Sequence, residues 1–149
     1  MQDIFTDEYF MKQALIQAKI AFEKDEVPVG AVIVFKNKII AKAHNLTETL
    51  TDATAHAEMQ AITSATNLLG SKYLKHCTLY VTVEPCVMCA GATYWSQLSK
   101  IVYGASDNKK GYKTFCKQII HPKTNVIDGV LEFECSELIT NFFSKIRNS

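Results

Sequence analysis

Apolar positions along the chain follow two spacings, one typical of amphipathic helices and one typical of buried strands. From Asp7 to Lys24 apolar residues recur every three to four positions, which predicts an amphipathic helix. Residues 29–35 are almost entirely apolar and, with residues 38–43 after a Lys36-Asn37 turn, predict a hairpin. The same patterns predict helices over 55–69, 86–98 and 130–147, and strands over 78–83, 101–105 and 126–128.

The predicted strands lack the polar alternation of a sheet that faces water on one side. Such strands have to be covered on both faces, so we expect an α/β protein with a central sheet between two layers of helices. The 149 residues contain no internal repeat, low-complexity tract or linker-like segment. We therefore expect a single domain over residues 1–149.

Charge and composition exclude few functions. Sixteen Lys and Arg against fifteen Asp and Glu give a net charge of +1, which indicates neither nucleic-acid binding nor its absence. No apolar run reaches the roughly 18 residues of a membrane span. The N-terminal residues show no signal-peptide pattern, and the five cysteines are an odd number, so we expect a cytoplasmic protein with free thiols.

Two short motifs about thirty residues apart carry the candidate chemistry, His56-Ala57-Glu58 and Pro85-Cys86-Val87-Met88-Cys89. One histidine and two cysteines provide three zinc ligands and leave a fourth position for water, as in catalytic zinc sites. Cys86 and Cys89 are spaced to share a helix face. His56 and Glu58 would point apart inside a helix, but first-turn side chains can converge beyond its N-terminus. Both motifs fall where helices are expected to begin, so two positive helix ends would face the metal.

Glu58 is the candidate general base. Two thiolates and an imidazole cancel the zinc charge, so a bound water is acidified less than by three histidines and needs a nearby base. Two other interpretations stay open. A thiol redox pair would use the two motif cysteines but leave His56 and Glu58 without a role. A closed structural zinc site would need a fourth ligand from Cys77, Cys116, Cys135, His44, His76 or His121.

With these motifs the chain resembles the cytidine deaminase-like zinc superfamily and, within it, the bacterial tRNA adenosine deaminases. The metal motifs indicate the superfamily. The Val-Pro-Val-Gly-Ala and Cys-Val-Met-Cys-Ala-Gly-Ala runs indicate the subfamily. The similarity extends nearly end to end, through residues 26–32, 54–58, 78–92, 104–105, 107, 129–131, 134–135 and 142–143.

The resemblance implies a three-layer α/β/α fold with a mixed sheet of about five strands, a homodimer, and one zinc ion per chain. It also implies hydrolysis of wobble adenosine to inosine in a tRNA anticodon arm. By the same resemblance Glu58 is the proton shuttle, Asn45 and the backbone N–H of Ala57 hold the target base, and Asp107 lies near the flipped nucleotide. The candidate substrate-binding residues are completed by Val29, Glu84 and Pro85.

Two segments depart from the tRNA enzymes. Residues 93–98 carry Tyr94-Trp95 where the tRNA enzymes usually have a smaller pair. Residues 111–124 lack the Gly-Ser or Gly-Thr followed by Asn-Leu that is usual in those enzymes. The aromatic pair resembles guanine deaminases, so a free-base deaminase acting on guanine or cytosine stays an alternative. In that case Tyr94 or Trp95 would form a wall of the substrate pocket. The other interpretation of this aromatic pair is that it packs between helices or forms a dimer contact. A non-catalytic zinc-stabilised RNA-binding module is a third possibility, although it has no use for Glu58.

Positive charge is concentrated in one stretch, Lys109 to Lys123, beside the expected active-site loop. Tyr112 and Phe115 are interleaved in this stretch, and no acid lies within it. The pattern fits either a phosphate track with stacking platforms or a solvated lysine-rich surface. The candidate RNA contacts among its lysines are Lys109, Lys110 and Lys113, and the other two are Lys117 and Lys123.

Overall fold

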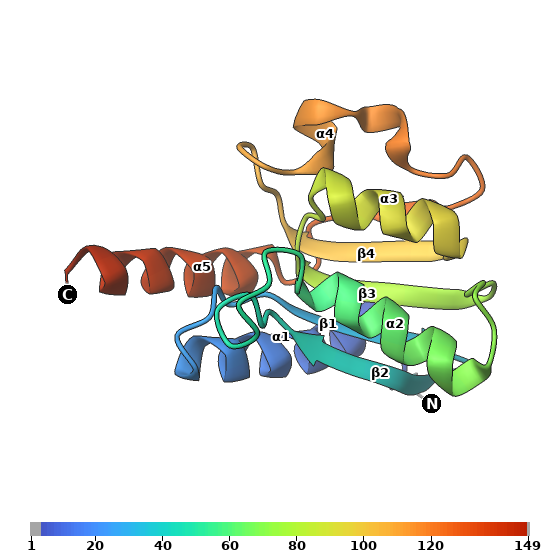
Figure 1. The fold of residues 1–149 in the computed structure, drawn as a ribbon, viewed down its shortest axis with the longest axis horizontal. Coiled ribbons are helices and arrows are strands. Elements are labelled where there is room, and N and C mark those ends of the chain that lie inside the picture. Colours follow the sequence, from blue (N-terminus) through green and yellow to red (C-terminus); the bar gives the residue numbers. More distant parts are fainter. Residues whose placement is uncertain (1–3, 149) are drawn as a thin grey trace.

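The computed structural model of the protein describes residues 4–148, and its centre is a mixed sheet of five strands (Figure 1). The strands lie in the order β2-β1-β3-β4-β5. β1 is antiparallel to both β2 and β3, whereas β3, β4 and β5 are parallel. Their bounds are β1 (Gly30–Phe35), β2 (Lys38–His44), β3 (Cys77–Val83), β4 (Lys100–Ala105) and β5 (Asn125–Ile127).

The predicted helices are confirmed, with ends that differ from the prediction by at most two residues. They are α1 (Asp7–Glu23), α2 (Ala57–Leu69), α3 (Val87–Ser96) and α5 (Glu132–Arg147). Two short elements were not predicted, α4 (Tyr112–Phe115) and the 3-10 turn η1 (Lys117–Ile119). Each has too few residues for a helical repeat of apolar positions to show in the sequence. No helix in residues 4–148 is both long and apolar enough to cross a membrane.

Two apolar clusters, one on each face of the sheet, explain why the strands are apolar throughout. On β1, Ala31 and Ile33 pack in the cluster that contains the buried alanines of α2 and α3. The alternate residues Val32 and Val34 pack in the other cluster, with α1 and the start of α5. Both faces are therefore covered, and the expected three-layer α/β/α architecture is confirmed.

The fold brings the beginnings of two helices to one edge of the sheet. Figure 1 shows α2 and α3 side by side on the same face, with their N-termini at the same end, and the two helices are in contact. At this end β4 leads into the loop before α4, and α5 extends beyond the sheet. The two predicted metal motifs lie at these helix starts, so side chains from distant segments can meet there.

Candidate active site

The three predicted zinc ligands meet in one cluster. Nδ1 of His56 lies 3.6 Å from Sγ of Cys86 and 3.5 Å from Sγ of Cys89, and the three donor atoms all lie within 4.8 Å of one another. No other group of three or more His, Cys, Asp or Glu donors is found within residues 4–148. A closed site with a fourth cysteine or histidine is thus not present in the described part of the chain.

The distances between these donors fit a tetrahedral zinc ion. With Zn–S of about 2.3 Å and Zn–N of about 2.0–2.1 Å, tetrahedral angles separate a sulfur and a nitrogen ligand by about 3.6 Å. Both nitrogen–sulfur distances in the cluster agree with that separation. Two thiols and one imidazole are also a donor set that zinc prefers.

Helix-start geometry explains why side chains two residues apart can serve one site. His56 is the N-cap of α2 and Cys86 the N-cap of α3, each with extended backbone at ψ 154° and 173°. As at other N-caps, their carbonyls accept bonds from the N–H groups of Gln60 and Ala90. Neither side chain caps its own helix, so both are available to a metal. The convergence predicted beyond two helix N-termini is what the structure shows.

Proton sharing among these groups favours a thiolate. A hydrogen bond from the Cys89 thiol, together with the bond with His56, lowers the pKa of Cys86 to about 4. The same bond to Cys86, together with burial, raises the pKa of Cys89. The hydrogen bond to Cys86 also raises the pKa of His56. Since the thiolate is the form that binds zinc, Cys86 is prepared for ligation.

Glu58 has the properties of a proton shuttle. It is in the first turn of α2 and only 4% exposed, yet it borders the cavity described below. Burial, reinforced by the nearby Cys86, raises the pKa of Glu58 from 4.5 to about 7. A carboxyl group that titrates near neutral pH can both take and return a proton. Glu58 is not one of the clustered metal donors, which leaves it available as a base.

A cavity of about 900 Å³ opens above this site. Its walls come from the segments before β1 and after β2, from the loop after β4, and from α5. The predicted residues that line it are Val29, Asn45, His56, Ala57, Glu58, Glu84, Cys86, Asp107, Lys109 and Lys110.

Two predicted contact residues take part in other interactions and do not line the cavity. The ammonium of Lys113 lies 3.2 Å from Oδ2 of Asp128 and sits over the ring of Tyr103, 5.3 Å from its centroid. Asp128 lies outside the acid-free stretch, so the lysine pattern alone did not reveal this partner. The carbonyl of Pro85 accepts a hydrogen bond from the N–H of Tyr112 at 2.9 Å.

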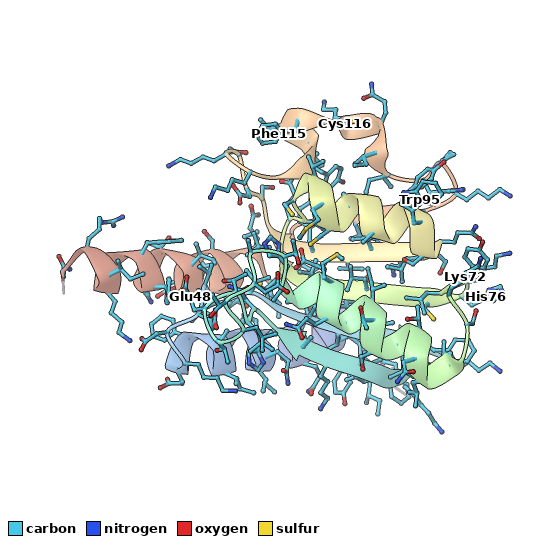
Figure 2. All side chains as sticks on the ribbon, viewed as in Figure 1. Glu48, Lys72, His76, Trp95, Phe115 and Cys116 are labelled. Carbon is cyan, nitrogen blue, oxygen red and sulfur yellow. The ribbon has the colours of Figure 1, made fainter. Side chains whose placement is uncertain are left out.

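Tyr94 and Trp95 do not form a wall of this cavity. Trp95 is 77% exposed, and its ring meets the ring of Tyr94 edge-on with a centroid separation of 5.6 Å. Figure 2 places Trp95 at the end of the molecule that carries Lys72 and His76, opposite the end with Glu48. The pair therefore gives no structural support to a free-base pocket.

Comparison with known proteins identifies the family. A family model described as MafB19-like deaminase matches residues 5–147. The tRNA-specific adenosine deaminase of Aquifex aeolicus is 49% identical over 146 residues, which cover 95% of this chain and 97% of that protein. The chain belongs to the tRNA-specific adenosine deaminase family.

Solved structures agree with membership of the tRNA-specific adenosine deaminase family. One from studies of A-to-I editing by tRNA:A34 deaminases is 41% identical, has a TM-score of 0.82, and covers 87% of this chain and 98% of its own. A guanine deaminase from Bacillus subtilis is also 41% identical, but at a TM-score of 0.65 and with coverage of 68% of this chain and 65% of its own. The deaminase fold is shared by both, and of these two structures the tRNA editing enzyme matches the larger share of this chain.

Some residues that support or line the site were not among the site residues predicted from the sequence. Glu26 is fully buried, and its carboxylate accepts hydrogen bonds from the N–H groups of Glu48 at 3.0 Å and Thr49 at 2.6 Å. These hydrogen bonds fix the backbone of the segment that follows Asn45. On α5, Phe142 is buried whereas Phe143 lines the cavity with Arg147. The Phe-Phe pair was part of the resemblance, but its spacing did not show which ring faces the site.

Proposed function

We propose that the protein hydrolyses adenosine to inosine at the wobble position of a tRNA anticodon loop, with one zinc ion per chain. The observation that carries the proposal is the buried Glu58 beside a three-donor zinc site at one cavity. Near-full-length similarity to a tRNA-specific adenosine deaminase supports the substrate. A non-catalytic RNA-binding module would need no buried carboxyl group here, since burying one without a role only costs stability.

The residues of the site suit the steps of a hydrolytic deamination. Zinc held by His56, Cys86 and Cys89 would supply an acidified water as nucleophile. Glu58 takes the proton of that water and delivers it to N1 of the adenine. It then takes the proton of the new hydroxyl group at C6 and passes it to the amino group, which leaves as ammonia. Asn45 and the backbone N–H of Ala57 line the same cavity and would orient the base so that C6 faces the nucleophile.

The surroundings of the site suit a polymeric substrate. The cavity volume, about 900 Å³, is far more than one purine base needs, so neighbouring nucleotides can enter. Lys109 and Lys110 are exposed at its rim, where they can meet phosphates. Oδ1 of Asp107 accepts hydrogen bonds from both of their backbone N–H groups, each at 3.0 Å, and so fixes the turn that presents them.

A substrate comparison tests the proposed function. We expect the pure protein to form inosine in an anticodon stem-loop with adenine at the wobble position, and to turn over free adenosine, guanine and cytosine very slowly. A tRNA enzyme uses binding energy from phosphates and flanking bases to hold the flipped base, and free bases do not provide that energy. Chromatography of the nucleosides and bases after incubation measures every product in one assay.

The guanine deaminase alternative predicts the opposite result. Rapid formation of xanthine from guanine with an unmodified stem-loop would replace the tRNA proposal by free-base deamination. The similarity to the Bacillus subtilis guanine deaminase makes guanine the free base to test first. The exposed position of Trp95 and its absence from the cavity wall favour the RNA substrate.

A second prediction concerns the lysines at the cavity rim. Replacing Lys109 and Lys110 by alanine should weaken stem-loop binding and flatten its salt dependence by about one unit of log-log slope per lost phosphate contact. The residual activity on free adenosine should hardly change, since the bound base lies deeper in the cavity. Binding titrations over a range of salt concentrations measure the slope.

The matched control for the rim lysines is the pair Lys72 and Lys75, which contact the ring of Tyr73. Figure 2 shows Lys72 at the end of the molecule away from Glu48. Replacing both by alanine removes the same total charge, but the slope should stay at the wild-type value. An equal change in both double variants would mean that Lys109 and Lys110 act only through net charge.

We further infer that the protein is cytoplasmic and, as the resemblance implies, a homodimer. Support for an interface comes from large aromatic side chains that are exposed in the single chain, Trp95 at 77% and Phe115 at 65%. Aromatic residues of this kind are enriched where protein surfaces meet. Trp95 would then serve the dimer contact that the sequence left open beside the pocket-wall interpretation.

A further inference from the structure

The loop that carries Asp107, Lys109 and Lys110 is attached at both of its ends to the segment that carries a zinc ligand. We call residues 107–113 the 107–113 loop. Just before it begins, the N–H of Glu84 donates to the carbonyl of Ala105 at 2.8 Å. Near its end the N–H of Tyr112 donates to the carbonyl of Pro85, and Gly111 forms an antiparallel bridge with Cys86. The loop and the ligand segment therefore run side by side.

The side chain of Glu84 joins both ends of this loop. Its carboxylate is in a residue only 5% exposed, with Oε1 accepting the N–H of Asp107 at 3.0 Å and Oε2 accepting the N–H of Lys113 at 3.1 Å. Hydrogen bonds to a carboxylate are about twice as strong as those between neutral groups. One side chain thus supplies an acceptor to two backbone groups that would otherwise lack a strong partner.

Gly111 leaves the space in which this carboxylate lies. A Cβ atom at position 111 would collide with the carboxyl group of Glu84 and with the carbonyl of Asp107. An alanine there has to displace the carboxylate or the loop. The same contact can therefore be disturbed from either partner, at residue 84 or at residue 111.

We propose that Glu84 is a positioning residue that fixes the 107–113 loop to the zinc-ligand segment and so sets where Asp107, Lys109 and Lys110 meet the substrate. Glu84 was expected among the substrate-binding residues. Its two carboxylate oxygens instead accept backbone N–H groups of the loop. The positioning role rests on backbone contacts alone, whereas the RNA as the bound ligand rests on the function proposed above.

Glu26 offers a matched control for a different segment of the chain, the one that follows Asn45. It is likewise buried, and it likewise accepts two backbone N–H groups, in this case from Glu48 and Thr49. Replacing either glutamate by glutamine keeps the side-chain size and removes one acceptor. If the effects are local, each variant should loosen only its own loop.

Amide hydrogen exchange of the zinc-loaded protein tests the proposal without any substrate. In Glu84→Gln we expect exchange across residues 107–113 to rise about ten- to hundredfold, because charge-assisted bonds to the loop are lost. Gly111→Ala should show the same change with Glu84 intact. Glu26→Gln should accelerate exchange at residues 48–49 and leave 107–113 at the wild-type rate.

A binding measurement then connects the loop to the substrate. With zinc content unchanged, Glu84→Gln should raise KM for the stem-loop about tenfold and flatten the salt slope as the Lys109/Lys110 double variant does. Unchanged amide exchange at residues 107–113 in Gly111→Ala would overturn the proposal. If Glu84→Gln fails to fold, the Gly111→Ala result alone decides whether the positioning role holds. A wild-type protein that leaves the stem-loop unmodified would instead refute the proposed function, and the exchange result would still decide the positioning role.

Discussion

Glu58→Gln is expected to yield a folded protein with one zinc ion per chain whose turnover falls by about 10²- to 10⁴-fold. Glutamine keeps the volume of the side chain but cannot take a proton from water. Glu58 is not among the three metal donors, so zinc should be retained. Burying a carboxyl group costs stability, so the neutral amide should not lower the melting temperature. Single-turnover deamination of the stem-loop and zinc analysis of the same sample measure both effects.

The control for this prediction is Glu137→Gln, which makes the same chemical change at an exposed position of α5 outside the cavity wall. Its turnover should equal that of the wild type. Loss of zinc from Glu58→Gln would mean that Glu58 is a ligand. Full turnover with zinc retained would remove Glu58 from the chemistry and assign the proton transfers to another group.

The cluster of three metal donors was predictable because its determinants are mostly local. The spacing of Cys86 and Cys89 places both on one helix face, and each metal motif lies where the sequence indicates a helix start. The structure adds that His56 and Cys86 are the N-caps themselves. Only the meeting of the two helix starts depends on the fold, and the apolar strands already indicated a sheet that carries both helices.

Interactions between distant segments were less accessible to sequence reasoning. Lys113 pairs with Asp128 because the loop after β4 lies near the end of β5, and that proximity follows from sheet topology. The contacts of Glu84 with the 107–113 loop have the same origin. Local spacing gives no signal for such pairs. The sequence marked Glu84 as a site residue through the resemblance, but could not show that it binds backbone.

Helix geometry accounts for the position of Trp95. It lies nine residues after Cys86, and at 1.5 Å per residue this places it about 13 Å along α3 from Cys86. A residue so far along the helix does not reach a cavity at its N-terminus. The likeness of the Tyr94-Trp95 pair to guanine deaminases is therefore a likeness of a surface away from the cavity, and it carries little weight for the substrate.

Cys86→Ala and Cys89→Ala are each expected to lose zinc and all measurable activity. Two remaining donors hold a zinc ion far more weakly than three, and the positive ends of α2 and α3 would no longer face two thiolates. Since metal binding contributes to folding free energy, both variants should also melt at a lower temperature than the zinc-loaded wild type. Addition of a chelator should lower the melting temperature of the wild type but leave that of the variants unchanged.

Cys116→Ala is the matched control, because Cys116 is a free, half-buried thiol outside the metal cluster. It should keep one zinc ion per chain, the wild-type turnover and the response to chelator. The assigned ligands would be disproved if Cys86→Ala purified with a full zinc complement and kept its activity. That result would show that the ion is held elsewhere. Loss of zinc from Cys116→Ala would make Cys116 a fourth ligand, the third thiolate, and a site closed to water in this way is incompatible with hydrolysis at this metal.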